Sequence, residues 1–129
     1  MNVLANDGIA IEGQEKLEKA GFKVVTEKVE QENLVKEINE KNYSALLVRS
    51  ATKVRKELID ACPGLKLIGR GGVGMDNIDV EYAESKGIVV VNTPASSSQS
   101  VAELVFAHLL SISRNLFDSN RQMPIKGHT

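Results

Sequence analysis

The 129-residue sequence has few of the features that mark membrane, secreted or disulfide-stabilised proteins. Its single cysteine, Cys62, excludes an internal disulfide and fits a reducing compartment, where the expected role is that of a small buried hydrophobe. No apolar run approaches the length of a membrane span, and the N-terminal MNVLANDG does not resemble a secretory signal. These absences predict a cytoplasmic protein without a membrane partner.

An excess of charge of one sign is missing as well. The sequence has 16 basic and 17 acidic residues, a net charge of -1, and no basic face or tail, which excludes nucleic acid as an expected partner. With 42% hydrophobic and 26% charged residues, the composition is typical of a globular protein with a substantial core.

What the sequence does contain is a regular alternation of short β-rich runs and helical segments. Strands are predicted at residues 2–5, 22–26, 44–49, 65–69 and 88–92. Three of these runs are almost continuously apolar, which favours strands of a parallel sheet buried on both faces. The repeat predicts a flavodoxin-like or Rossmann-like α/β fold, with a doubly wound parallel sheet and helices on both faces.

Helix signals stand between the predicted strands. We expect a first helix that buries Leu17 and Ala20 and ends at Gly21, and a second with an apolar stripe of Leu34, Val35 and Ile38. We expect Thr52 to cap a third helix that contains Val54, Leu58 and Ile59, and Asp79 to cap a fourth that Gly87 ends.

The last predicted helix differs from the others. Ser100 and Glu103 match a capping box, and the segment 101–118 that follows has apolar residues on most of its sides. Such a helix requires burial against more than one small sheet, so we expect a second domain or a second subunit, and self-association of the isolated chain. The sequence reads as if it stopped within a longer protein.

The segment LKLIGRGGVGMDNID contains a G-x-G-x-x-G pattern at Gly69, Gly71 and Gly74. In a dinucleotide-binding turn the helix begins within this pattern, and an acidic residue ends the next strand. Here residues 75–79 intervene before a helix can begin, and the next strand ends in Asn92-Thr93-Pro94. The context therefore argues against a cofactor fingerprint.

Arginines stand at the ends of two predicted strands: Arg49 is the last residue of one, and Arg70 directly follows the other. Arg49 is followed by Ser50, and Arg70 begins the glycine loop. Open α/β sheets bind ligands at the carboxyl ends of their strands, and guanidinium groups bind carboxylate or phosphate bidentately. The pattern favours an anion site, and the alternative is that both arginines are solvated or paired with Asp76 and Asp79.

Rival α/β modules fit the sequence less well. A phosphoacceptor domain would use Asn6-Asp7 in its acidic pair, but Arg49 ends the strand where it needs an aspartate. The segment NDGIAIEG does not resemble a flavin-phosphate loop. The hydroxyl-rich loop 93–100 could hold an anion at a helix N-terminus, although capping of the long helix is the favoured interpretation.

Three segments, LLVRSATKV, LKLIGRGGVGMDNIDVEYAESKGIVVVNTP and SVAELVFAHLLSISRN, together resemble the N-terminal part of D-2-hydroxyacid dehydrogenases. The resemblance implies that residues 1–98 form a substrate-binding domain and that residues 99–129 hold the linking helix and the start of the NAD-binding domain. It also implies that the dinucleotide fingerprint and the catalytic arginine, acid and histidine lie beyond Thr129. His108 and His128 do not match that histidine, so the chain alone should be inert.

Several contacts follow from the resemblance by position. Arg49, Ser50 and Arg70 match residues near the substrate phosphate. The loop of Gly71, Gly72, Val73 and Gly74 matches the backbone that approaches the substrate carboxylate and the nicotinamide. Val73, where relatives often have Thr, and Val101 match residues near the nicotinamide.

The implied reaction is hydride transfer from C2 of a phosphorylated D-2-hydroxy acid to NAD in a homo-oligomer, such as a dimer. The alternatives are a relative that acts on hydroxypyruvate or glyoxylate, and a stand-alone module that binds small anions.

Overall fold

A parallel β-sheet positions every candidate residue in the N-terminal part of the chain. The computed structural model describes residues 1–127, and the chain divides into two compact units after Pro94. The first unit contains β1 (Asn2–Ala5), α1 (Ile11–Lys19), β2 (Lys23–Val25), α2 (Gln31–Glu40), β3 (Tyr43–Val48), α3 (Lys56–Ala61), β4 (Leu67–Arg70), α4 (Val80–Ser85) and β5 (Val89–Asn92). All predicted strands are confirmed, with ends that differ by at most two residues.

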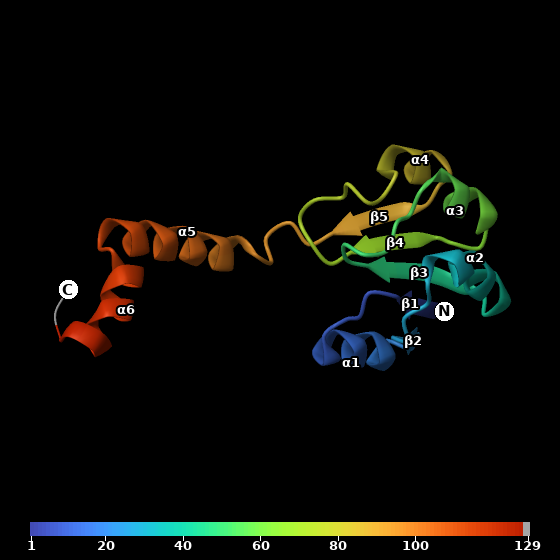
Figure 1. Cartoon of the computed structure of the whole chain (residues 1–129). Coiled ribbons are helices and arrows are strands. Elements are labelled where there is room, and N and C mark those ends of the chain that lie inside the picture. Colours follow the sequence, from blue (N-terminus) through green and yellow to red (C-terminus); the bar gives the residue numbers. More distant parts are fainter. Residues whose placement is uncertain (128–129) are drawn as a thin grey trace. The chain divides into compact units, whose positions relative to one another are not determined.

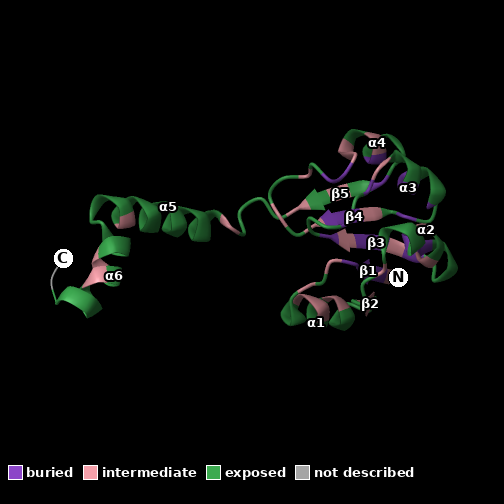
Figure 2. Ribbon diagram, viewed as in Figure 1, coloured by how far each residue is buried: buried purple, intermediate pink, exposed green. Residues whose placement is uncertain are grey.

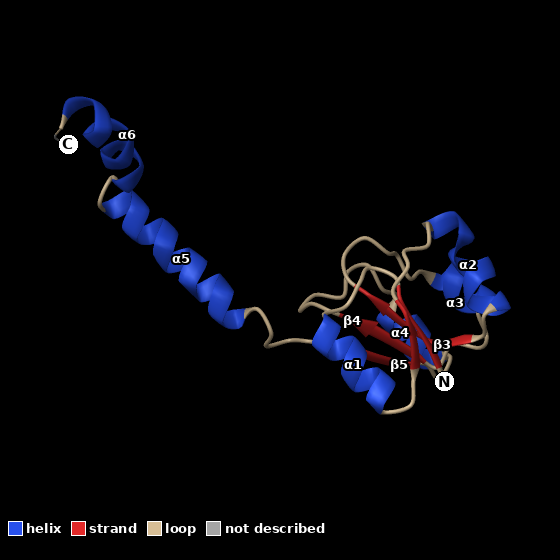
Figure 3. Ribbon diagram, turned by 90° about the horizontal axis from the view of Figure 1, so that it is seen from below, coloured by secondary structure: helices blue, strands red, loops and turns tan. Residues whose placement is uncertain are grey.

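The strand order is β2-β1-β3-β4-β5, and every neighbouring pair is parallel. Helix α1 lies on one face of this sheet, and α2, α3 and α4 lie on the other (Figures 1 and 3). Because the crossovers are right-handed, this division follows from the reversal of strand order between β1 and β3. The predicted doubly wound α/β fold is confirmed, and its switch point lies between these two strands.

The core fills the space between the sheet and helices α2, α3 and α4, which cover one of its faces. Leu4, Leu46 and Ile68 on the central strands are fully buried, and they form one cluster with apolar residues of α2, α3 and α4. Figure 2 shows this burial concentrated on the strands and on the inner sides of those helices. Leu34 and Ile38 are buried in α2 as predicted. Cys62 is fully buried too, and desolvation raises the pKa of its thiol, which confirms the role of a small hydrophobe.

The opposite face is covered less completely. Helix α1 contributes no buried residue: Leu17 is half-buried, and the prediction that Ala20 is buried was wrong because Ala20 already ends the helix. Gly21 follows with φ of 86°, as its predicted role in ending the helix requires. On the edge strand β5, Val89 and Val91 are 56% and 45% exposed.

Two predicted side-chain caps do not form, for the same reason, although α4 begins after Asp79 as predicted. Thr52 does not cap α3, which begins at Lys56, and Val54 lies outside the helix in a bridge to Ile78. Asp79 occupies the N-cap position of α4, but its carboxylate accepts a hydrogen bond from the Lys56 amide of α3 at 3.1 Å instead of capping its own helix. In both cases a contact distant in sequence takes the polar side chain away from the local capping role.

The second unit holds α5 (Ser98–Ser113) and α6 (Leu116–Lys126). The predicted segment 101–118 is broken at Asn115, whose φ of 48° is left-handed. The predicted capping box is also wrong, since α5 begins at Ser98, which puts Ser100 inside the helix. The apolar side chains of α5 are exposed, among them Leu104 at 58% and Leu109 at 58%. No helix within residues 1–127 has the length and hydropathy that membrane crossing requires.

Candidate functional site

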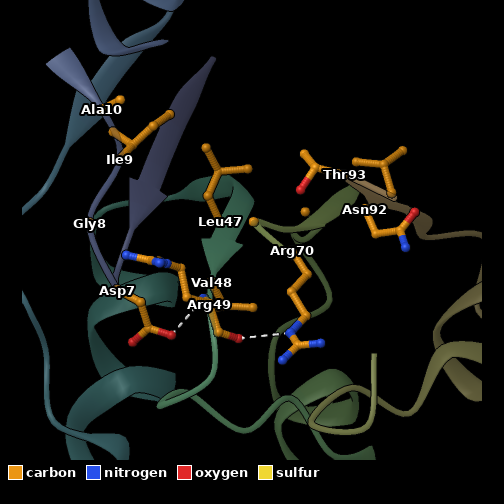
Figure 4. A pocket seen from close by; sticks show the side chains of 13 residues that line it. Asp7, Gly8, Ile9, Ala10, Leu47, Val48, Arg49, Arg70, Asn92 and Thr93 are labelled. Atoms are coloured by element: carbon orange, nitrogen blue, oxygen red, sulfur yellow. Dashed lines mark hydrogen bonds between the residues drawn. The ribbon is translucent and has the colours of Figure 1, made fainter. Parts of the chain in front are cut away.

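A cavity of about 710 Å³ opens at the carboxyl ends of β1, β3, β4 and β5. Its lining combines apolar side chains, among them Ile9, Leu47 and Val91, with the polar side chains of Arg49, Arg70 and Asn92. Figure 4 shows these polar side chains around the cavity. The parallel register places Val48 opposite Arg70 and Arg70 opposite Asn92. Arg49, which follows Val48, therefore lies at the same end of the sheet as Arg70 and Asn92. This is the edge where doubly wound sheets bind their ligands.

The two arginines of the predicted anion site both line this cavity, but their side chains run in different directions. Figure 4 shows the Arg49 side chain extending toward Gly8, beyond the end of β1. Arg49 is exposed, and together with Lys28 and Ser50 it also lines a neighbouring polar hollow of about 470 Å³. Arg49 therefore presents its charge to solvent at the switch point of the sheet.

Arg70 is held much more tightly. Its side chain is only 11% exposed, and its Nε donates to the backbone carbonyl of Arg49 at 3.1 Å. A longer contact of 3.4 Å reaches the hydroxyl of Ser50, and a terminal nitrogen lies 3.5 Å from the carboxylate of Asp76. The proposed pairing with Asp76 is thus present but long, whereas Asp79 pairs with Arg55 at 2.8 Å. Arg70 joins the end of β4 to the loop after β3.

The glycine loop wraps around this guanidinium group. A Cβ atom added at Gly74 would lie 3.1 Å from a terminal nitrogen of Arg70, and one at Gly72 would lie 3.6 Å from the guanidinium carbon. Gly69 also lines the cavity, and a Cβ added there would come within 2.7 Å of the Leu47 side chain. None of the glycines of this loop has a positive φ. At Gly69 and Gly74, the close approach of Leu47 and Arg70 leaves little room for a side chain.

The four residues of the predicted amide loop do not have equal hydrogen-bonding capacity. The Gly71 amide donates to the carbonyl of Val48 at 2.9 Å, and the Gly72 amide donates to the carbonyl of Arg70 at 3.0 Å. Within residues 1–127, the amides of Val73 and Gly74 have no acceptor. Only these two N–H groups are free to bind an anion, and the Val73 side chain beside them is 51% exposed.

The end of β5 supports the same loop, which the sequence patterns did not reveal. The Asn92 side chain donates to the carbonyl of Val73 at 2.6 Å, and the Thr93 amide donates to the carbonyl of Gly72 at 3.1 Å. The corresponding sequence signal is the polar pair Asn92-Thr93 at the end of an apolar strand.

Asp7, which follows β1, was also missed as a site residue. Its carboxylate accepts hydrogen bonds from the Arg49 amide at 2.7 Å and from the hydroxyl of Thr52 at 2.7 Å. Partial burial raises its pKa, but these hydrogen bonds outweigh that effect, so the pKa of Asp7 lies below its usual value. Asp7 is therefore ionised at neutral pH, next to the main chain of Arg49.

The residues present do not form a nucleotide-phosphate site. Helix α4 begins only at Val80, six residues after Gly74, and β5 ends in Asn92 where a dinucleotide fold places an acid. Val101 lies in the other unit and is 55% exposed on α5, where His108 is exposed as well; His128 lies outside the described residues. Among the described residues, no group of three or more His, Cys, Asp or Glu side chains could hold a metal ion.

The sequence that forms this doubly wound sheet and its ligand-binding edge matches the model of a known protein family. Residues 3–119 match the family model for the catalytic domain of D-isomer specific 2-hydroxyacid dehydrogenases. The chain belongs to this family of oxidoreductases.

Individual relatives agree with the family match. The chain is 43% identical to a D-3-phosphoglycerate dehydrogenase of Methanocaldococcus jannaschii over 90% of its own length and 22% of the relative. It is 45% identical to a hydroxypyruvate reductase of Thermotoga maritima over 78% of its length and 32% of the relative. The NAD+-bound 3-phosphoglycerate dehydrogenase of Entamoeba histolytica superposes with a TM-score of 0.70 at 35% identity, over 86% of this chain and 38% of that one. The chain thus spans about a fifth to a third of the curated relatives' length.

Proposed function

We propose that this chain is the substrate-binding part of an NAD-dependent D-3-phosphoglycerate dehydrogenase, the enzyme that begins serine biosynthesis. The observation that carries the proposal is the combination of Arg49 and Arg70 with the free amides of Val73 and Gly74 at one edge of the sheet. A phosphorylated hydroxy acid has two anionic groups, and this edge offers donors for both. The names of several relatives support the same substrate.

In this proposal the two ends of the substrate bind to different parts of the edge. The phosphate binds the exposed guanidinium of Arg49 and the hydroxyl of Ser50, since both face open cavities. The carboxylate binds the amides of Val73 and Gly74, which have no partner within residues 1–127. Arg70 contributes its positive charge and holds the Arg49 carbonyl, so we assign it to both binding and support.

The proposed reaction oxidises 3-phospho-D-glycerate at C2. The C–H bond at C2 breaks and its hydride passes to the nicotinamide of NAD+, while the hydroxyl proton leaves to a base. The products are 3-phosphooxypyruvate, NADH and a proton. No residue of this chain is assigned to the base or to the nucleotide phosphates, and Val73 and Val101 are proposed only as apolar neighbours of the nicotinamide. We further propose a cytoplasmic homo-oligomer.

The test is a substrate panel with the complete protein. We expect NAD+-dependent oxidation of 3-phosphoglycerate with a kcat/KM at least about tenfold above that for D-glycerate, because the phosphate adds charge-assisted hydrogen bonds. Arg49→Ala should raise KM for 3-phosphoglycerate far more than KM for D-glycerate. An Arg49→Ala enzyme with unchanged KM for 3-phosphoglycerate would refute the site assignment.

A second candidate function is reduction of hydroxypyruvate or glyoxylate. Because the chain is 45% identical to a hydroxypyruvate reductase, the substrate panel includes hydroxypyruvate and glyoxylate. Such an enzyme would prefer the unphosphorylated keto acids and would tolerate Arg49→Ala. The preferred substrate therefore separates the two functions directly.

A further inference from the structure

The loop that follows β3, residues 49–52, is clamped at both of its ends. Asp7 accepts the backbone N–H of Arg49 at 2.7 Å and that of Thr52 at 3.0 Å, both at the same carboxylate oxygen. The other oxygen accepts the hydroxyl proton of Thr52 at 2.7 Å. One carboxylate after β1 thus binds the first and last amides of the loop.

A carboxamide binds the matching carbonyl groups from the other side. The side-chain nitrogen of Asn77, which follows the glycine loop, donates to the carbonyl of Arg49 at 2.9 Å and to that of Thr52 at 2.7 Å. Asn77 is 6% exposed, so these hydrogen bonds are shielded from water. The main-chain donors and acceptors of both terminal loop residues are therefore satisfied by two side chains distant in sequence.

We call the contacts of Asp7 and Asn77 with Arg49 and Thr52 the clamp. A third residue, Asn6, holds the Thr52 hydroxyl that donates to Asp7. Asn6 donates to the hydroxyl oxygen of Thr52 at 2.9 Å, and its own carbonyl oxygen accepts the amide of Val29 at 2.7 Å. Asn6 and Thr52 are 2% and 4% exposed. This buried network leaves Ser50 and Ala51 as the exposed middle of the loop.

We propose that Asp7 and Asn77 are positioning residues for the anion site: they hold the 49–52 loop so that the Arg49 guanidinium and the Ser50 hydroxyl face the incoming anionic group. The inference rests on the proposed function, because it assigns that anion to the Arg49 loop. The clamp spans the switch point between β1 and β3 and ties the glycine loop to it, so one network orients both halves of the site. Preorganised donors bind more tightly because less ordering is required on binding.

The charge of Asp7 makes this inference sharply testable. A carboxylate in the lining of an anion site opposes an anion by Coulomb repulsion, so its removal should strengthen anion binding if charge were its only effect. If Asp7 acts by holding the loop, its removal weakens anion binding despite the loss of a negative charge. The two accounts predict changes of opposite sign.

The experiment titrates the ¹⁵N-labelled 129-residue chain with 3-phosphoglycerate and follows the backbone amide signals. Asp7→Ala removes both the charge and the clamp. Asp7→Asn removes the charge, but its amide oxygen can still accept the two loop amides and its NH₂ can donate to the Thr52 hydroxyl. Glu84→Gln, an exposed site on α4, is the matched control for the loss of one negative charge. The same spectra report whether each variant is folded, and amide hydrogen exchange at Arg49 and Thr52 reports the clamp.

We expect Asp7→Ala to weaken 3-phosphoglycerate binding about tenfold and to accelerate exchange at Arg49 and Thr52, with Asp7→Asn recovering much of both. Glu84→Gln should change the affinity by less than about twofold. If Asp7→Ala fails to fold, Thr52→Val, which keeps the side-chain shape and removes only the hydroxyl, should weaken binding about threefold by loosening the same network.

The outcomes separate the inference from the function on which it rests. Equal or tighter binding by folded Asp7→Ala, or by Thr52→Val where Asp7→Ala does not fold, overturns the clamp while the anion site stands. Absence of any response at the Arg49 and Ser50 amides of the unsubstituted chain overturns the proposed anion site and the clamp with it.

Discussion

Replacement of Arg70 probes the residue that contributes both charge and geometry to the site. Its Nε donates to the Arg49 carbonyl at 3.1 Å from a side chain that is 11% exposed. A hydrogen bond of this kind, with a charged donor, contributes about 1.5–3 kcal/mol. The contact with Asp76, which is 88% exposed, adds only about 0–1 kcal/mol because solvent screens it.

For Arg70→Ala we therefore expect the free energy of unfolding to fall by about 2 kcal/mol. In a unit of this size that corresponds to a decrease in Tm of roughly 8–16 °C. Arg70→Lys keeps the positive charge but lacks the planar fork, so about half of this loss should remain. Both variants should bind 3-phosphoglycerate more weakly, because the Arg49 carbonyl loses a donor that fixes the loop.

The measurements are thermal unfolding and titration with 3-phosphoglycerate, with Arg55→Ala as the control. Arg55→Ala also removes one positive charge, but Arg55 lies outside the cavity and pairs with Asp79 at 2.8 Å. Arg55→Ala should leave 3-phosphoglycerate binding nearly unchanged. The reasoning fails if Arg70→Lys matches the unsubstituted chain in both Tm and affinity, since charge alone would then be sufficient.

Three further predictions follow from other parts of the chain. The pKa of Asp7 lies below its ordinary value of 3.8, so its ionised form stabilises the fold above that value, and this contribution is lost as the pH falls through the folded-state pKa. The free energy of unfolding, measured in urea between about pH 5 and pH 2.5, should therefore depend less on pH in Asp7→Asn than in the unsubstituted chain. Because Phe106 and Leu109 on α5 are 62% and 58% exposed, we expect the chain to self-associate and Leu109→Glu to reduce this, and a strictly monomeric sedimentation profile at high concentration would contradict it. Gly69→Val should fill part of the cavity beside Leu47 and weaken 3-phosphoglycerate binding more than Gly69→Ala does; equal titration curves would argue against the cavity as the binding site.

The sheet was predictable from the sequence because its signals are local. Apolar runs long enough for a strand alternate with helical stripes, and Gly21 and Gly87, both with positive φ, end helices as predicted. Parallel strands joined by single helices leave few possible topologies. The site residues at the strand ends could be located for the same reason, since Arg49 follows β3 and Arg70 ends β4, two strands that pair directly.

The hydrogen-bond network could not be predicted, since its partners are far apart in the chain. Thr52 resembles a helix cap in sequence, but Asp7, 45 residues away, takes its hydroxyl. The glycine loop suggested a backbone open to an anion, whereas Gly71 and Gly72 donate to carbonyl groups and only Val73 and Gly74 have free amides among residues 1–127. Propensity and spacing describe neighbours along the chain, and these contacts form only once the sheet is assembled.

The most direct test of the account is the preference of the complete protein for a phosphorylated over an unphosphorylated substrate. We would measure kcat/KM for 3-phosphooxypyruvate and for hydroxypyruvate with NADH, in the unsubstituted enzyme and in Arg49→Ala. The account predicts a preference for the phosphorylated substrate of at least about tenfold, which Arg49→Ala largely abolishes by lowering only that kcat/KM. A preference for hydroxypyruvate, or a phosphate preference that survives in Arg49→Ala, would contradict it.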